Sequence, residues 1–260
     1  ANCAVAEQRS NDVSQGLVDL VSPFWWNGTY EIETIARYKE ESLDLLAASR
    51  MHMAALGAEA GSQEQQEKIK KKIHIPDIEK ALERLWKRGM QSGCSWIIGY
   101  PGETKESMLA TIERAAEMKH KFPRSASDIF PFRPIPGTED YDAAVELGYR
   151  PPETLEDWGS SLEYKLAVDD IRLPMDVFLR WKRYGVTSTF YDGLVDQGSG
   201  VLRGAMKESA GWRLKHGNYR FPLEQKLWHM YVKTTRQSSE DRLEKDRTSG
   251  VTPQDRKSVV

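Results

Sequence analysis

The fold is decided by the stretch Ser95-Trp96-Ile97-Ile98-Gly99-Tyr100-Pro101-Gly102-Glu103-Thr104. Its first half is an apolar run typical of a buried strand, and its second half is a glycine- and proline-rich turn that leads into a helix. A related strand end, Gly57-Ala58-Glu59-Ala60-Gly61-Ser62, lies upstream, and Pro134-Ile135-Pro136-Gly137-Thr138-Glu139 lies downstream. Three such strand ends in succession predict an active-site face at the carboxyl ends of parallel strands.

Strand and helix patterns alternate through the first 150 residues, with a period of roughly 30 to 40 residues, the size of a βα unit. This alternation predicts a parallel sheet, and the continuous apolar runs favour strands that are buried on both faces. We expect an α/β fold, either a parallel barrel, complete or partial, or an open sheet. The patterns place strands at 24–29, 51–56, 94–98 and 128–132, and helices at 39–49, 76–88, 104–119 and 140–147.

The character of the chain changes after Pro151. Residues 151–236 are expected to form a mostly helical C-terminal extension of the barrel domain (1–150), with helices at 174–195 and 221–233 and large aromatic anchors. Residues 237–260 are polar and without apolar periodicity, which predicts disorder. The last six residues, 255–260, match the translation of a common sequencing adapter, so we expect them to be an artefact.

Composition excludes several classes of function. The net charge of −2 gives no electrostatic reason to expect nucleic acid or a membrane surface as the partner. No apolar run reaches the roughly 18 residues that span a bilayer. The two cysteines, Cys3 and Cys94, are too few for a disulfide framework and fit a reducing compartment, so we expect the protein in the cytoplasm. The five histidines form no zinc-binding spacing, and no phosphate-binding glycine loop is present.

Glu59 is the sharpest candidate for a functional side chain, because a carboxylate that ends an apolar strand needs a partner or a ligand. Ser62 either shares that site or caps the next helix. In the Gly99 turn, small residues let a ligand approach the backbone; alternatively the turn is structural, with Thr104 as the helix cap and Glu103 at the positive helix end.

Arg133 follows the next strand, and its guanidinium either grips a carboxylate of a ligand or pairs with Glu59 or Glu139. Asn27 and Glu31 follow the aromatic first strand and either face the same strand-end mouth or serve a turn, which is the favoured interpretation. The run Lys70-Lys71-Lys72 is interpreted as a solvated loop edge.

The three strand-end motifs, in this order and spacing, resemble those of the radical S-adenosylmethionine (SAM) enzymes, most closely the subgroup that often carries an N-terminal cobalamin-binding domain. The resemblance covers residues 2–149. It implies a partial parallel barrel, reductive cleavage of SAM, and radical chemistry such as methyl transfer, cyclisation or rearrangement on an unknown small organic substrate. It places Glu59 and Ser62 near the ribose and methionine of SAM, Ile97, Ile98 and Gly99 at the adenine, and Arg133 at a carboxylate.

The same resemblance implies a [4Fe–4S] cluster, an electron donor such as a flavodoxin or ferredoxin, and cobalamin held by a preceding domain. One feature departs from the family: its Cys-x-x-x-Cys-x-x-Cys loop is absent, because Cys3 and Cys94 are 91 positions apart. We interpret Cys94 as a small buried hydrophobe. The abrupt start at Ala1 favours a fragment whose cluster loop lies upstream and which is inactive alone.

Two other interpretations of the sequence remain open. The chain is either a degenerate barrel that acts as a binding or scaffold module, or an unrelated α/β-barrel enzyme that uses Glu59 as a general acid–base. Upstream sequence without clustered cysteines would support the first, and turnover in iron-free aerobic buffer would support the second.

Overall fold

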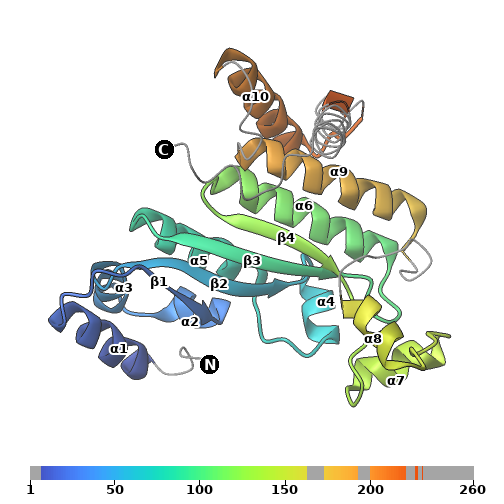
Figure 1. The fold of residues 1–260 in the computed structure, drawn as a ribbon, viewed down its shortest axis with the longest axis horizontal. Coiled ribbons are helices and arrows are strands. Elements are labelled where there is room, and N and C mark those ends of the chain that lie inside the picture. Colours follow the sequence, from blue (N-terminus) through green and yellow to red (C-terminus); the bar gives the residue numbers. More distant parts are fainter. Residues whose placement is uncertain (1–6, 163–172, 193–199, 221–225, 228–229, 231–260) are drawn as a thin grey trace, which may run out of the picture. The chain divides into compact units, whose positions relative to one another are not determined.

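A single four-stranded sheet, with every neighbouring pair parallel, organises the fold in the computed structural model (Figure 1). Its strands, in the order β1-β2-β3-β4, are β1 (Trp26–Tyr30), β2 (Met51–Glu59), β3 (Gln91–Ile98) and β4 (Ala126–Pro131). The expected α/β class and parallel sheet are confirmed. The structure describes residues 7–162, 173–192, 200–220, 226–227 and 230.

Helices connect the strands and continue the chain after the sheet. They are α1 (Glu7–Asp19), α2 (Ile32–Arg37), α3 (Glu40–Ala48), α4 (Gln63–Lys68), α5 (Ile75–Lys87), α6 (Lys105–Lys121), α7 (Glu139–Glu146), α8 (Leu155–Leu162), α9 (Met175–Asp192) and α10 (Gly200–His216). The helices expected at 39–49, 76–88, 104–119, 140–147 and 174–195 are confirmed, and α1, α2, α4, α8 and α10 are additional. Cys3, the tail 237–260 and most of the helix expected at 221–233 lie outside the described residues.

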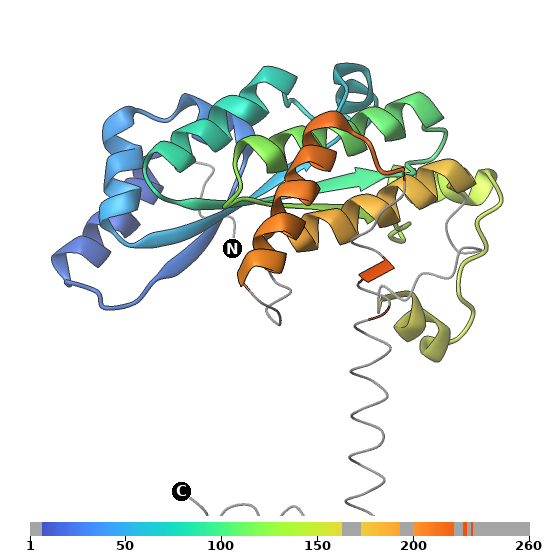
Figure 2. The same ribbon diagram turned by 90° about the horizontal axis from the view of Figure 1, so that it is seen from above.

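One face of the sheet is buried under helices. Figure 2 shows α5 and α6 on the same side of the strands. The buried side chains alternate along each strand, as in Leu56, Trp96 and Ile98, and they pack with Ile78 of α5 and Ile112 of α6 in one hydrophobic core. Burial of this face, at about 25 cal/mol per Å² of apolar surface, is what holds the helices to the sheet.

The opposite face of the sheet is only half-buried, which corrects the expectation of burial on both faces. On β2 and β3 this face carries Ala55, Gly57, Gly93 and Ser95, all partly exposed. These side chains are small, and the described helices leave this face partly open to solvent. A partial barrel has such a face on its inside, where a ligand rather than a helix layer covers the strands.

The last helices of the described chain cover the free edge of β4. The indole nitrogen of Trp181 on α9 donates to the carbonyl oxygen of Ile129 at 2.9 Å, and the Tyr184 hydroxyl donates to the carbonyl oxygen of Ser127. Both carbonyl groups lie on the side of β4 that faces away from β3. The helical extension expected after Pro151 therefore protects an edge strand that would otherwise be open to pairing.

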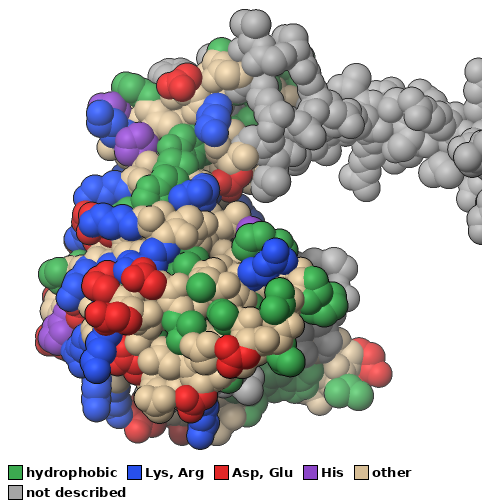
Figure 3. All heavy atoms as spheres, turned by 90° about the vertical axis from the view of Figure 1, so that its left-hand side faces the viewer, with side chains coloured by type: hydrophobic (Ala, Val, Ile, Leu, Met, Phe, Trp, Pro, Cys, Tyr) green, Lys and Arg blue, Asp and Glu red, His purple; other side chains and the backbone are tan. Residues whose placement is uncertain are grey.

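The chain divides into two compact units. Residues 1–219 hold all the elements above, and residues 220–260 form the second unit. The boundary expected near residue 150 stays a prediction. On the side of the first unit that Figure 3 shows, acidic and basic side chains lie beside one another, as the near-zero net charge suggests. No helix among the described residues is both long and apolar enough for a bilayer crossing.

Candidate functional site

Glu59 ends β2 in a backbone conformation that side chains rarely adopt. Its φ is +60°, in the left-handed region that disfavours every residue with a Cβ. Its carboxylate lies back over Gly57, where a Cβ on that glycine would come 2.7 Å from Oε1. The Glu59 side chain is 14% exposed and its Oε1 atom pairs with Lys71 Nζ at 3.1 Å. Such strain at the mouth of a sheet is typical of functional positions.

Gln66 of α4 fixes the backbone around Glu59, and Ser62 caps the start of that helix. The fully buried side chain of Gln66 donates through Nε2 to the carbonyl oxygens of Ala58 and Ala60, both at 2.7 Å. Ser62 accepts the backbone N–H of Gln65 at 3.3 Å, so it is the N-cap of α4, one of the two roles that the sequence allowed. Gln66 was missed from the sequence because nothing in its local spacing marks it.

The Gly99 turn is held by Glu103. The Oε2 atom of Glu103 accepts the backbone N–H groups of Gly99 at 2.7 Å and Tyr100 at 3.1 Å, and Oε1 accepts the Ser107 hydroxyl at 2.7 Å. Burial raises the pKa of the Glu103 carboxyl above its usual range. Glu103 was expected to act only through the helix end, but it closes the turn directly, while Thr104 caps α6 as predicted.

Gly99 has a structural explanation that needs no ligand. Its φ is +86°, and a Cβ there would lie 2.8 Å from Cδ2 of Leu173, which comes from the segment before α9. The close approach that glycine permits is thus made by the protein itself. The Gly99 and Tyr100 N–H groups are already donated to Glu103, so a ligand at this turn would have to use other contacts.

Ile97 and Ile98 point to opposite faces of β3, because side chains alternate along a strand. Ile98 is fully buried in the core with α6, whereas Ile97 is partly exposed on the open face. A ligand on the open face can therefore contact the side chain of Ile97 but only the backbone of Ile98, and the adenine assignment of these residues stays a prediction. Ile97 keeps that candidate role.

Each of the two carboxylates proposed as partners of Arg133 pairs with a lysine. Glu59 pairs with Lys71, and Glu139 pairs with Lys70. Both lysines are largely exposed in the loop after α4, as the interpretation of this run as a solvated edge predicts, and each also forms an ion pair. Arg133 itself is half-buried just beyond β4.

Asn27 and Glu31, the two candidates near the first strand, lie in different parts of the structure. Asn27 lies inside β1, paired in register with Met53 of β2, so it does not serve a turn. Glu31 lies between β1 and α2, where it makes no side-chain cap. Its side chain faces a polar groove.

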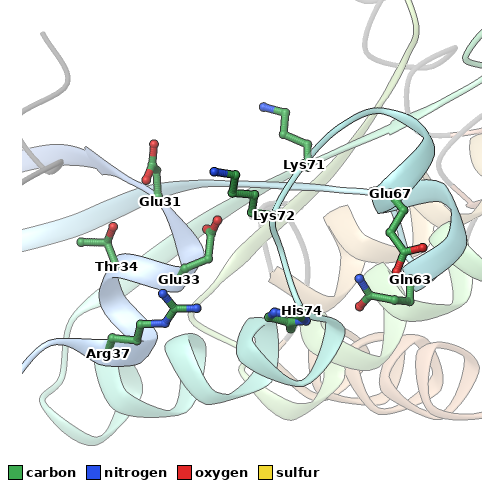
Figure 4. Close-up of a pocket in the computed structure, with 9 residues that line it drawn as sticks. All are labelled: Glu31, Glu33, Thr34, Arg37, Gln63, Glu67, Lys71, Lys72 and His74. Carbon is green, nitrogen blue, oxygen red and sulfur yellow. The ribbon is translucent and has the colours of Figure 1, made fainter.

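This groove lies beside the strand ends and has a volume of about 570 Å³ (Figure 4). Acidic, basic and neutral polar side chains from α2, α4 and the loop after α4 line it: Glu31, Glu33, Thr34, Arg37, Gln63, Glu67, Lys71, Lys72 and His74. Lys71 belongs both to the groove and to the Glu59 ion pair. The groove therefore adjoins the strained strand end.

The residues present do not fit an iron–sulfur cluster. Within the described residues, no three His, Cys, Asp or Glu side chains gather as metal ligands. Cys94 lies inside β3, 2% exposed, and burial raises the pKa of its thiol to about 12. A cluster ligand must be an accessible thiolate, so Cys94 is the buried hydrophobe that the sequence predicted.

Comparison with solved structures finds similarities at low identity. TsrM from Kitasatospora setae, a radical SAM methyltransferase solved with tryptophan and a SAM analogue, is 17% identical, with a TM-score of 0.41 over 50% of this chain and 25% of that one. HemN from Escherichia coli, a radical SAM coproporphyrinogen III oxidase, is 15% identical, with a TM-score of 0.45 over 73% and 38%. OxsB, a cobalamin-dependent radical SAM enzyme, is 12% identical, with a TM-score of 0.45 over 88% and 40%. The chain spans about a quarter to two-fifths of these structures.

A protein-family model matches part of this chain. No curated protein matches the sequence. The family model described as the Radical SAM superfamily matches residues 26–115, which run from the start of β1 into α6 and include Glu59, Gln66 and the Gly99 turn. Arg133 and the segment around Glu139 lie beyond the matched range. Residues 26–115 are therefore similar to the family that the strand-end motifs resemble, and they contain the first two of the three motifs.

Proposed function

We propose that this chain supplies the SAM-binding side of a radical SAM active site. The observation that carries the proposal is Glu59, a carboxylate held in a strained conformation at the end of β2, inside the segment that matches the superfamily. The whole enzyme would cleave SAM reductively and start radical chemistry on an unknown small organic substrate. That chemistry belongs to SAM, the cluster and an external electron donor; the residues described here bind and orient.

The arrangement gives each candidate a limited task. The Glu59 carboxylate can accept hydrogen bonds from the ribose hydroxyls or the ammonium of SAM, with Lys71 on its other side. Ile97 offers an apolar surface on the open face of β3, and Ser62 stabilises the α4 start. Gln66 holds the two carbonyl groups that fix the Glu59 backbone. Arg133 remains the candidate partner of a carboxylate.

The cluster and cobalamin enter the proposal only through sequence outside this chain. Three thiolates hold the cluster in this family, and this chain has two cysteines in total. We therefore expect no stoichiometric four-iron cluster after anaerobic reconstitution of this chain with iron and sulfide. A stoichiometric cluster would contradict the assignment of Cys94 as a structural residue.

The proposal is tested with a ligand that needs no cluster. S-adenosylhomocysteine carries the adenosine and amino-acid parts of SAM, and its binding to the purified chain is measured by calorimetry. We expect binding that Glu59→Gln weakens by at least tenfold, since one good charged hydrogen bond contributes about 1.5–3 kcal/mol. Glu64→Gln, an exposed change on α4, is the matched control. Absence of binding by the folded wild-type chain, or equal binding by both variants, would overturn the proposal.

A non-catalytic binding module is the second candidate. It is favoured by the same cysteine count, because a barrel that lost its cluster can keep a ligand cleft. The two candidates differ in what precedes residue 1 in the gene. Clustered cysteines after an apolar strand would favour the enzyme, and their absence would favour the binding module.

A further inference from the structure

A short segment rich in lysine touches all three strand-end turns. It comprises residues 68–71, from the last residue of α4 into the loop that follows, and we call it the lysine strap. Lys68 Nζ donates to the carbonyl oxygen of Gly102 at 2.6 Å, beyond the end of β3. Lys70 pairs with Glu139, which follows β4, and Lys71 pairs with Glu59 at 3.1 Å, at the end of β2. Each lysine therefore reaches a different turn.

The backbone of the strap is fixed independently of these side chains. The backbone N–H of Lys70 donates to the carbonyl oxygen of Glu67 at 3.0 Å, and that of Lys71 donates to the carbonyl oxygen of Gln66 at 2.9 Å. Lys70, like Glu59, has a left-handed backbone, with a φ of +58°. Beyond the strap, Gln63 binds the backbone of Ile73 and Ile75, which ties the end of the loop to the start of α4.

We infer that the lysine strap positions the three turns relative to one another, with Lys68, Lys70 and Lys71 as positioning residues. An exposed ion pair alone contributes little, since both side chains must be ordered and water screens the charges. Here one ordered backbone segment carries all three lysines. The conformational entropy lost in ordering that backbone is therefore shared among three contacts. The strap can thus set the spacing between the Glu59, Gly102 and Glu139 turns.

The first test measures hydrogen exchange and does not depend on any ligand. We compare wild type with Lys68→Met, Lys70→Met, Lys71→Met and the triple variant. The control is Lys72→Met, which removes the same charge from the next residue; Lys72 lines the groove and touches no strand-end turn in any contact that the described residues make. For the triple variant we expect amide exchange in 57–62, 99–104 and 134–139 to rise about fivefold or more over the control.

Salt and a conservative substitution separate positioning from a general loss of folding. Because Lys70–Glu139 and Lys71–Glu59 are ion pairs with exposed lysines, about 0.5 M salt should raise exchange in 57–62 and 134–139 in wild type and leave the triple variant almost unchanged. Lys71→Arg should keep exchange in 57–62 at the wild-type level, whereas Lys71→Met should raise it, since a guanidinium can still pair with Glu59. Equal exchange in the triple variant and Lys72→Met would overturn the inference.

The second test connects the strap to ligand binding and rests on the proposed function. S-adenosylhomocysteine should bind the triple variant about three- to tenfold more weakly than it binds Lys72→Met. Failure of wild type to bind would contradict the proposed function. The hydrogen-exchange result would still show whether the strap positions the turns. Normal binding by the triple variant despite faster exchange would contradict a positioning role for the strap in the cleft.

Discussion

The indole nitrogen of Trp181 lies 2.9 Å from the carbonyl oxygen of Ile129, so a side chain of α9 takes the place of a neighbouring strand at the edge of β4. Tyr184, one helical turn later, does the same for Ser127. Large aromatic side chains in this segment were expected to serve as apolar anchors. Their polar atoms also satisfy strand carbonyl groups that a buried edge would leave without partners.

Removing these two donors should weaken the β4 edge. Trp181→Phe and Tyr184→Phe keep most of the apolar contact and delete one hydrogen bond each, so we expect each to lower the free energy of unfolding by about 1–2 kcal/mol. Urea unfolding followed by circular dichroism measures it. Trp212→Phe, at an exposed tryptophan of α10, is the control and should change the free energy by less than about 0.5 kcal/mol. Equal effects at Trp181 and Trp212 would show that the Ile129 contact contributes nothing.

Glu103 should make stability depend on pH. Its pKa is raised in the folded state by burial, so the folded protein holds this proton more tightly than the unfolded chain, where the pKa is near 4.5. The contribution of Glu103 is therefore full below pH 4.5 and falls as the pH rises through the raised pKa. Glu103→Gln removes this titration. We expect the stability of wild type relative to Glu103→Gln to fall between pH 4 and pH 7 in urea titrations.

Deleting the Glu103 side chain has a different effect. Glu103→Ala leaves the Gly99 and Tyr100 N–H groups without their acceptor, and we expect a loss of about 1–3 kcal/mol at every pH in that range. A difference between wild type and Glu103→Gln that does not vary with pH would contradict the burial of a titrating carboxyl group.

Local signals in the sequence predicted the elements whose causes are local. Thr104 caps α6 through an N–H three residues away, and Gly89, with a φ of +76°, follows the C-cap of α5, as is common for glycine. The apolar spacing that identified α5 also identified its buried face, including Ile78 and Leu85. Caps and amphipathic faces act over one or two helical turns, so a single sequence is sufficient to find them.

Contacts between distant residues could not be predicted in the same way. Lys70 and Glu139 are 69 positions apart, and nothing in the spacing of either segment links them. Leu173 approaches Gly99 from another part of the chain. Because the sequence does not show this contact, one interpretation of the glycine was that it leaves space for a ligand. Which of several charges pair, and what fills the space at a glycine, is decided by tertiary packing.

At position 59 we expect ligand binding to favour glutamate and stability of the fold to favour glycine. Glu59→Gly relieves the left-handed strain and Glu59→Ala keeps it, while both remove the carboxylate. We expect the glycine variant to be more stable than the alanine variant by about 1 kcal/mol. Thermal unfolding measures the difference, and both variants should bind S-adenosylhomocysteine equally poorly. An alanine variant as stable as the glycine variant would mean that the backbone relaxes at this position.

The ion pair between Lys119 and Asp192 should respond asymmetrically to the removal of its two members. Lys119 is 1% exposed on α6 and donates to the carbonyl oxygen of Ser125, whereas the Asp192 side chain is 28% exposed. Asp128 also interacts with the charge of Lys119. Asp192→Ala leaves the buried ammonium without the carboxylate to which it donates, for which we expect a loss of about 2–4 kcal/mol. Lys119→Met leaves only a carboxylate that water can reach, so its loss should be about 1 kcal/mol. The double variant should resemble Lys119→Met in urea unfolding, because the charge that made Asp192→Ala harmful is gone. If the double variant instead lost the sum of both single effects, the two side chains would be acting independently, and the pair would not be what joins α6 to α9.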